Sequence, residues 1–274
     1  MPPRSRETED SGREQEGGTR LVLEVYAAGS LRSALTEVAH AFERQEAVRV
    51  KMTFGASGLL KERIMAGETP QVFASANMAH PGALAAAGKA SEVAAFAGNT
   101  MCVLAAPSFS LQGKTLALRL LDDEVRVGIS TPGSDPSGDY AFDVFERIEA
   151  SSAAGAGSAR LLKRKARQLT GAADSPRPSG NGSIYGELVA GGQADAFLTY
   201  RTNAVLACGE HPGLKVVPVP QAINVCARYG LALLVPETDA ARRYVRYLVG
   251  SEGQAILSSY GFSAPCANSA DSRR

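Results

Sequence analysis

Short apolar runs alternate with amphipathic stretches along the chain, in the order expected of strands followed by helices. Residues 21–26 form an apolar run that ends at the small residues 27–30, and residues 48–54 alternate between apolar and polar side chains before the small residues 55–58. After each run, apolar residues recur every three or four positions, as on one face of a helix. This alternation of strand and helix predicts an α/β fold with a mainly parallel sheet.

The same pattern continues through the rest of the chain, so further elements can be assigned by residue range. We expect strands at residues 71–75, 100–106, 125–129, 196–200, 216–219 and 231–235. We expect helices at residues 82–87, 139–149, 183–191 and 238–249, with one short helix in the basic run 161–169. Residues 151–160 are rich in Ser, Ala and Gly, which is typical of a flexible segment.

The composition is that of an ordinary globular protein. Hydrophobic residues make up 45% and charged residues 21% of the 274 residues, enough for two lobes with buried cores. The formal net charge of +1 gives no bulk attraction to nucleic acid or to a membrane surface. A bound anion would therefore have to be attracted by a specific site. No apolar run reaches the roughly 18–20 residues of a membrane span.

The four cysteines, Cys102, Cys208, Cys226 and Cys266, lie far apart and form no C-x-x-C pair. That spacing argues against a zinc site or a redox motif. Two alternatives stay open: a disulfide such as Cys208–Cys226 in an oxidising compartment, or buried free thiols.

Four places share one design, in which a strand or loop ends in small polar residues and a helix follows at once. They are Ser30, Ser57, the corner Pro136-Ser137-Gly138, and the segment Asn181-Gly182-Ser183. A helix start leaves about four backbone N–H groups without partners and carries roughly half a positive charge, so it can receive an anion. A serine at a helix start is usually only an N-cap. Ser30 and Ser57, however, also follow predicted parallel strands, at the sheet edge where ligands bind.

Five segments resemble, in order and spacing, the periplasmic molybdate-binding proteins of ABC transporters. They are VYAAGSLRSAL, FGASGLLKERI, DPSGDYAFDVF, GGQADAFLTYRTNA and YGFSAP, and the resemblance covers residues 22–265. It implies a two-lobed periplasmic-binding-protein-like fold, in which each lobe is a mixed, mainly parallel sheet flanked by helices. The ligand would lie in the cleft between the lobes.

The resemblance also implies a ligand site for a tetrahedral oxyanion, with molybdate or tungstate expected first. Its members would be the hydroxyls of Ser30, Ser57 and Tyr200 and the backbone amides of Ser137 and Gly182. These residues would contact the oxygens of the oxyanion, and none would coordinate the metal directly. No cofactor is expected. The chain departs from the family at Gly182, where an apolar residue is usual, at Ser137, where Ala is frequent, and in a longer, more basic segment 150–178.

The order of these motifs predicts how the chain is divided. Residues 1–20 are polar and expected to be disordered, residues 21–104 and 223–265 form lobe 1, residues 105–222 form lobe 2, and residues 266–274 form a flexible tail. Both lobes contribute to one ligand, so binding should close the cleft by a hinge motion. The expected partner is an ABC permease, and the expected state is a monomer in the periplasm. Residues 1–20 lack the apolar stretch of a secretory signal, so a genuine start at Met1 would favour the cytoplasm.

The predicted cage contains only hydrogen-bond donors, and this bears on selectivity. Hydrogen phosphate keeps a proton that needs an acceptor, whereas molybdate, tungstate and sulfate are fully deprotonated. A cage without an acceptor would leave that proton unpaired, at a cost of about 1–3 kcal/mol. Asp139 lies near the corner and would change this argument if it faced the ligand; we expect it to cap its own helix.

Other functions are less well supported by the residues. The chain contains no G-x-S-x-G, H-E-x-x-H or P-loop motif, so we expect no enzyme activity. His40, His80 and His211 lie away from the predicted site. A protein that binds sulfate or another anion, and an intracellular oxyanion-sensing domain, both remain alternatives. A nucleic-acid role is not expected, because the basic run near residue 164 is typical of a solvated helix face.

Overall fold

The computed structural model describes residues 21–152, 154–176 and 182–265. Its strands are β1 (Leu21–Ala28), β2 (Val48–Gly55), β3 (Val72–Ser75), β4 (Ala90–Ala105), β5 (Val127–Ser130), β6 (Arg167–Thr170), β7 (Ala196–Tyr200), β8 (Lys215–Pro218) and β9 (Cys226–Leu234). Its helices are the short 3-10 helix η1 (Gly29–Leu31), α1 (Arg32–Gln45), α2 (Ser57–Met65), α3 (Ala79–Ala86), α4 (Leu116–Leu121), α5 (Pro136–Ala150), α6 (Ser158–Lys165), α7 (Ile184–Ala190), α8 (Arg201–Glu210), α9 (Asp239–Val249) and α10 (Ser251–Ser259). The predicted α/β class is confirmed.

The strands follow the spatial order β2-β1-β3-β9-β4-β7-β5-β6, and β8 pairs with β4. β1 is parallel to β2 and β3, and β5 is parallel to β6 and β7, whereas β4 and β9 pair only antiparallel with their neighbours. Within β1 and β2 the register sets Ala28 beside Gly55. The two small-residue motifs that follow these strands therefore lie next to each other.

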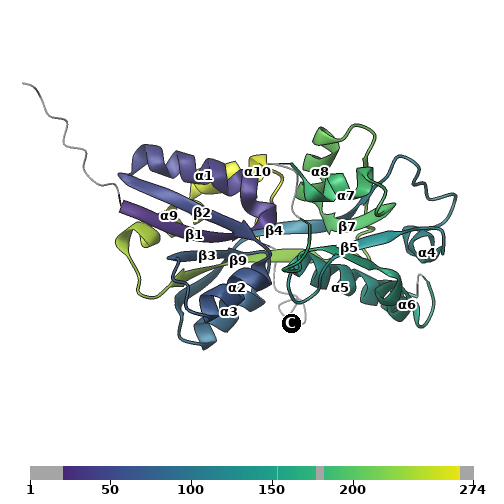
Figure 1. The fold of residues 1–274 in the computed structure, drawn as a ribbon, viewed down its shortest axis with the longest axis horizontal. Helices are drawn as coiled ribbons and strands as arrows, with labels where there is room; N and C mark the ends of the chain where they lie inside the picture. The colour runs from purple at the N-terminus through teal and green to yellow at the C-terminus, as the bar shows by residue number, and fades with distance from the viewer. Residues whose placement is uncertain (1–20, 153, 177–181, 266–274) are drawn as a thin grey trace, which may run out of the picture.

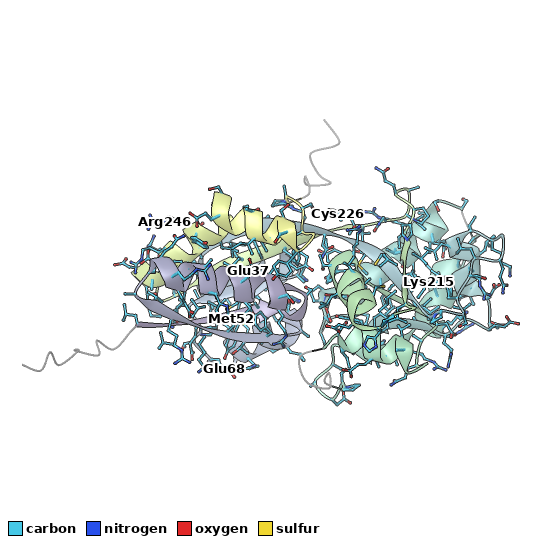
Figure 2. The ribbon with its side chains drawn as sticks, turned by 90° about the horizontal axis from the view of Figure 1, so that it is seen from above. Glu37, Met52, Glu68, Lys215, Cys226 and Arg246 are labelled. Atoms are coloured by element: carbon cyan, nitrogen blue, oxygen red, sulfur yellow. The ribbon has the colours of Figure 1, made fainter. Side chains whose placement is uncertain are left out.

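Strand β4 runs through both lobes of the molecule. Residues 90–100 of this strand pair with β9. Met101 to Ala105 pair with β7, and Cys102 to Ala105 also pair with β8. Figure 1 shows β1, β2 and β3 on one side of this crossing and β5 and β7 on the other, with helices above and below the strands. Viewed from above in Figure 2, Cys226 at the start of β9 lies between the two lobes, so β4 and β9 are the connecting strands. The predicted division of the chain into two lobes that move relative to each other stays a prediction.

Helix α1 packs into the core with the apolar residues that its spacing predicted. In α1, Leu35, Val38 and Phe42 lie on one face and are almost completely buried. Phe42 meets the ring of Tyr244 from α9 edge-on, with ring centroids 5.3 Å apart. Each such buried apolar side chain stabilises the fold by about 1.5–3 kcal/mol.

Several elements differ from the predicted ranges. The predicted strand at 100–106 begins ten residues earlier, at Ala90, and the predicted helix at 161–169 is divided into α6 and the edge strand β6. Helices α4, α8 and α10 were not predicted. The segment 151–160, expected to be flexible, includes the start of α6 at Ser158. The predictions for residues 1–20 and 266–274 lie outside the described residues.

The structure decides between the two alternatives for the cysteines, a disulfide such as Cys208–Cys226 or free thiols. Cys226 is disulfide-bonded, whereas Cys102 and Cys208 are free, so the pairing Cys208–Cys226 does not form. Burial raises the pKa of the Cys102 thiol to about 12, so this cysteine stays protonated at neutral pH. Within the described residues, no helix has the length and hydrophobicity needed to cross a membrane.

Candidate functional site

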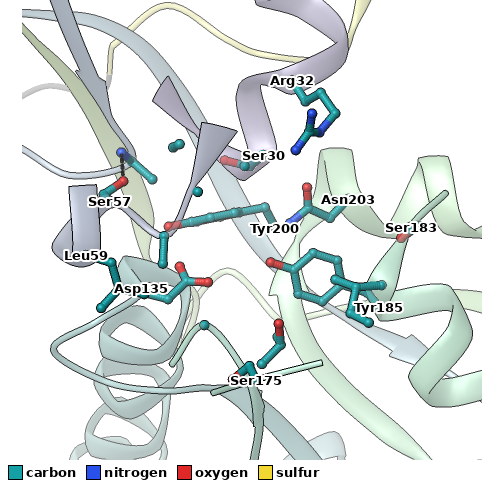
Figure 3. A pocket seen from close by; sticks show the side chains of 18 of the residues that line it. Ser30, Arg32, Ser57, Leu59, Asp135, Ser175, Ser183, Tyr185, Tyr200 and Asn203 are labelled. Atoms are coloured by element: carbon teal, nitrogen blue, oxygen red, sulfur yellow. Dashed lines mark hydrogen bonds between the residues drawn. The ribbon is translucent and has the colours of Figure 1, made fainter. Parts of the chain in front are cut away.

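A cavity of about 660 Å³ lies between the two lobes, where several strands end and helices begin. Four of the five predicted site residues line it: Ser30, Ser57, Gly182 and Tyr200. Ser30 and Ser57 come from the first lobe, and Gly182 and Tyr200 from the second. Figure 3 shows the labelled side chains of Ser30, Ser57 and Tyr200 pointing into this shared space.

Ser30 lies in η1, directly after β1. Its Oγ is 2.9 Å from the hydroxyl of Tyr229, and either oxygen can be the donor. Tyr229 is fully buried, and its ring packs against Tyr200 with centroids 5.5 Å apart. The Ser30 hydroxyl is therefore held in place by a core residue of β9.

Ser57 is the first residue of α2 and is 1% exposed. Its Oγ accepts a hydrogen bond from the backbone N–H of Ala76 at 3.1 Å. Because that bond uses a lone pair of the oxygen, the hydroxyl proton of Ser57 remains available to a ligand. The sequence signal for this residue was its position after a parallel strand, and the cavity lies at that edge of the sheet.

Tyr200 ends β7 and is the N-cap of α8. The residue is 1% exposed, and its hydroxyl has no hydrogen-bond partner among the described residues. Burial, with the nearby Tyr229 and Asp135, raises the pKa of Tyr200 well above its ordinary value, so the hydroxyl stays protonated and can donate. A buried donor without a partner is costly, and a bound acceptor would remove that cost.

In the loop before α7, some hydrogen-bond donors are already bound within the protein and others are available to a ligand. Ser183 caps this helix, and its Oγ accepts from the N–H of Gly186 at 3.3 Å, which leaves the hydroxyl proton available. The N–H of Ser183 itself donates to Oε2 of Glu210 at 2.7 Å. The Ser183 amide is therefore already occupied, whereas Gly182 and the Ser183 hydroxyl border the cavity.

Ser137 is placed differently from the other four predicted residues. It is fully buried in the first turn of α5 and is not among the residues that line the cavity. Its N–H donates to Oδ1 of Asp135 at 3.0 Å, so a carboxylate of the same chain occupies the amide that the prediction reserved for the ligand. Asp135, the N-cap of α5, lines the cavity instead.

The N-cap of α5 is Asp135, so the expectation that Asp139 caps this helix is wrong, and Asp139 bonds instead to the loop before the helix. Its Oδ1 accepts from the N–H of Gly133 at 2.8 Å, and the residue does not line the cavity. The acidic residue of this corner that lines the cavity is Asp135, four positions earlier. Sequence reasoning considered Asp139 and overlooked Asp135, although Asp directly before Pro at a helix start is a strong N-cap signal.

Arg32 is a second residue that sequence reasoning missed. It lines the cavity from the first turn of α1, two positions after Ser30, and its guanidinium lies 4.7 Å from the centre of the Phe54 ring. Arg63 also borders the cavity, but it forms an ion pair with Glu68 at 2.8 Å. Among the residues that the structure describes, Arg32 has no carboxylate within ion-pair distance.

The two lobes touch directly beside the cavity. The N–H of Gly58 in α2 donates to the carbonyl of Ser134 at 2.8 Å. A Cβ on Gly58 would lie 2.5 Å from the carbonyl oxygen of Gly133 and 2.6 Å from that of Ser134. Only glycine therefore permits this approach of the lobes, next to the cavity-lining residues Ser57 and Asp135.

The cavity offers donors suited to an anion and no ligand set for a metal ion. Across residues 21–152, 154–176 and 182–265, no group of three or more His, Cys, Asp or Glu is arranged to hold a metal. The groups that line it include the hydroxyls of Ser57 and Tyr200, several helix starts and the Arg32 guanidinium, together with the carboxyl group of Asp135. Such an array can bind an oxyanion by charge-assisted hydrogen bonds.

Comparison with known proteins finds relatives over most of the chain. Residues 23–263 match the family described as bacterial extracellular solute-binding protein. An uncharacterized protein of Pasteurella multocida (strain Pm70) is 34% identical over 242 residues, which cover 88% of this chain and 98% of that protein. The molybdate-binding protein ModA of Mycobacterium tuberculosis (strain ATCC 25618 / H37Rv) is 30% identical over 254 residues, covering 90% of this chain and 86% of that one.

Solved structures with low sequence identity share the fold. The periplasmic molybdate-binding protein of Azotobacter vinelandii has a TM-score of 0.68 at 20% identity, with 89% of this chain and 100% of that chain covered. The sulfate-binding protein SubI of Mycobacterium tuberculosis H37Rv has a TM-score of 0.73 at 16% identity, with 91% and 88% covered. The predicted two-lobed fold and the resemblance to molybdate-binding proteins are thereby confirmed.

Proposed function

Because the chain belongs to the bacterial extracellular solute-binding proteins, we propose that it captures a small oxyanion between its lobes and delivers it to the permease of an ABC transporter. Molybdate is the first candidate, since curated relatives at 30% identity are molybdate-binding proteins. Tungstate, with the same shape and charge, is the second. One observation carries the proposal: the buried hydroxyl of Tyr200, which has no partner among the residues that the structure describes, faces the same cavity as the hydroxyls of Ser30 and Ser57.

The donors explain how a dianion would be held without a direct ion pair. Each hydrogen bond to a charged oxygen contributes about 1.5–3 kcal/mol, so three or four of them support micromolar or tighter binding after the cost of association. Ser30 and Ser57 would approach from one lobe, and Tyr200 and Gly182 from the other. Because the donors lie on both lobes, the ligand would favour the closed arrangement.

The location and partners follow from the family and from one covalent feature. A disulfide at Cys226 favours an oxidising compartment, and therefore the periplasm over the cytoplasm. We propose that the protein acts there as a monomer and without catalytic activity. The disulfide also disfavours the alternative of an intracellular oxyanion-sensing domain. Sulfate remains a competing ligand, because it offers the same tetrahedral set of oxygens.

Isothermal titration calorimetry and thermal denaturation with molybdate, tungstate, sulfate and phosphate test this proposal. A ligand present at about a hundred times its dissociation constant should stabilise the fold by about 2.7 kcal/mol and raise the melting temperature by several degrees. We expect molybdate or tungstate to give this shift, and Ser30→Ala and Ser57→Ala to abolish most of it. Absence of heat and of stabilisation with all four anions would overturn the proposal.

A matched control separates loss of binding from loss of folding. Ser110 is exposed and lies outside the cavity, so Ser110→Ala removes a serine hydroxyl at a position that does not contact the ligand site. Its titration should equal that of the unaltered protein. An equal loss in Ser110→Ala and Ser57→Ala would show that the serine changes act through the fold and not through the site.

A further inference from the structure

Two carboxylates line the cavity, Asp135 and Glu62, and of these Glu62 forms an ion pair with Lys61 at 2.6 Å. Asp135 lines the cavity together with Ser57 and Tyr200, and Figure 3 shows its carboxyl group directed into the same space. One oxygen of this group, Oδ1, accepts the N–H of Ser137 at 3.0 Å. A dianion held by the neighbouring donors would therefore lie close to a carboxylate of the protein.

The Asp135 side chain has little freedom to move away. A Cβ on Gly171, in the loop after β6, would lie 2.6 Å from Cβ and 3.1 Å from Oδ2 of Asp135, so the backbone of this loop packs closely against the carboxyl group. The bond to Ser137 restrains its other side. Withdrawal from the cavity would break the N-cap of α5 and leave the N–H of Ser137 without its acceptor.

The charged groups around Asp135 do not neutralise it. On its own helix Asp139 contributes a like charge, and Tyr185 of α7 and Tyr200 of β7 face it as neutral phenols. The opposite wall contributes Arg32, Glu62 and Arg63, and Arg63 is paired with Glu68. No cation of the described residues forms an ion pair with Asp135.

We propose that Asp135 makes one proton part of the bound complex, so that the site holds an oxyanion together with a proton shared between the ligand and the Asp135 carboxyl group. When the ligand is fully deprotonated, as molybdate and sulfate are, the proton comes from solvent and is carried by the Asp135 carboxyl group. Hydrogen phosphate, or a phosphate monoester that carries a proton, supplies the shared proton itself and donates it to the ionised Asp135. Asp135 is thus a specificity-determining residue, and this role rests on the proposed function of the cavity as an oxyanion site.

The ionisation of Asp135 supports this coupling and gives its direction. Burial raises the pKa of Asp135 to about 6 in the empty site, partly offset by the N–H of Ser137. A bound dianion adds a like charge and raises the pKa further. Below about pH 6, Asp135 already carries the proton before the ligand binds. Above this pH, a deprotonated dianion must bind together with a proton from solvent, so its affinity falls about tenfold per pH unit, up to the pKa of Asp135 in the complex. The affinity for hydrogen phosphate should stay level over the same range.

Calorimetry of the full chain with Asp135→Asn tests the proposal. Asn is an equally good N-cap, and while its Oδ1 accepts from Ser137 its amide N–H groups point into the cavity as permanent donors. Titrations at about pH 6.5, 7.5 and 8.5, each in two buffers with different heats of ionisation, report the affinity and the number of protons taken up. Asp139→Asn, which removes the same charge one turn further along α5 and outside the cavity, is the matched control.

In the unaltered protein and in Asp139→Asn, we expect molybdate and sulfate to bind with uptake of about one proton at the highest pH and with the tenfold slope. In Asp135→Asn we expect no uptake and a level affinity for molybdate and sulfate. The preference for sulfate over hydrogen phosphate should therefore exceed that of the unaltered protein by a factor that grows as the pH rises. Binding of molybdate and sulfate without proton uptake, with equal pH profiles in all three proteins, would overturn the role of Asp135 alone. Absence of binding by every oxyanion would overturn the proposed function and this inference together.

Discussion

The two walls of the cavity are built by the same rule and yet offer different chemistry. In lobe 1, Ser30 and Ser57 follow the parallel strands β1 and β2 and present hydroxyls at helix starts. In lobe 2, three amides near helix starts are already bound to carboxylates: Ser137 to Asp135, Ser183 to Glu210 and Gly133 to Asp139. A helix start alone does not make an anion site, since an acidic residue of the same chain can occupy its N–H groups first.

The largest effect should come from the contact that joins the two walls. In Gly58→Ala, the added Cβ would collide with the carbonyl oxygens of Gly133 and Ser134, so the lobes could not close around the ligand. We expect the dissociation constant for molybdate to rise by about a hundredfold or more, the penalty for a closed state that is rarely populated. Calorimetry measures the affinity, and small-angle scattering with and without molybdate measures closure.

Gly82 provides the matched control for that change. It lies in α3, where an added Cβ meets no atom within 4 Å, and Gly82→Ala should leave the affinity unaltered. Alanine in place of glycine within a helix should also raise the free energy of unfolding, by about 0.5–1 kcal/mol. If Gly58→Ala binds and closes like Gly82→Ala, the contact between the walls has no role in binding.

The next largest effect should separate the donors of the two walls. Tyr200→Phe removes a buried hydroxyl that has no partner in the described part of the chain, so it should weaken binding while leaving the ligand-free fold as stable or slightly more stable. Ser57→Ala also leaves the N–H of Ala76 without its acceptor, so it should reduce both binding and stability. We expect about a ten- to hundredfold rise in the dissociation constant for each, by calorimetry, with thermal denaturation separating the two cases. A Tyr200→Phe protein with full affinity would contradict the proposed site.

A smaller effect should come from the cation at the edge of lobe 1. Arg32→Gln removes an exposed guanidinium that contributes attraction at a distance and no ion pair. We expect about a two- to fivefold loss of affinity at low salt, and less than that near 0.15 M ionic strength, where the Debye length is about 8 Å. Titrations at two salt concentrations measure this difference, and a loss that is independent of salt would indicate a direct hydrogen bond to the ligand.

The smallest effect should come from the corner of lobe 2. The hydroxyl of Ser137 is buried, has no partner among the described residues and does not reach the cavity. Ser137→Ala should therefore change the dissociation constant less than about twofold and should stabilise the fold slightly, because a buried polar atom is removed. Calorimetry and thermal denaturation of this variant test both statements. A large loss of affinity would mean that the corner reaches the ligand in a further closed state.

Sequence reasoning succeeded where local spacing decides the structure. Strands β1, β2 and β7 and helices α1 and α9 were recognised because their apolar residues repeat with a clear period. It failed at β6, whose residues Arg167 to Thr170 form a polar edge strand with little apolar signal, and at the first part of β4, where alanines suit helix and strand equally. In these two places pairing with a neighbouring strand, which the local sequence does not contain, decides the conformation.

Tyr200 was predicted as a donor only through the resemblance to molybdate-binding proteins. By itself, the spacing along the sequence determined the α/β class and the position of Ser30 and Ser57 at the ends of parallel strands. These follow from the order of strands and helices, which the spacing of apolar residues encodes locally. Only the tertiary structure decided that Asp135 faces the cavity while Ser137 does not, and that Gly58 meets Ser134. Such facts depend on which way a side chain points and on how closely two distant segments approach, and both are set by packing across the whole molecule.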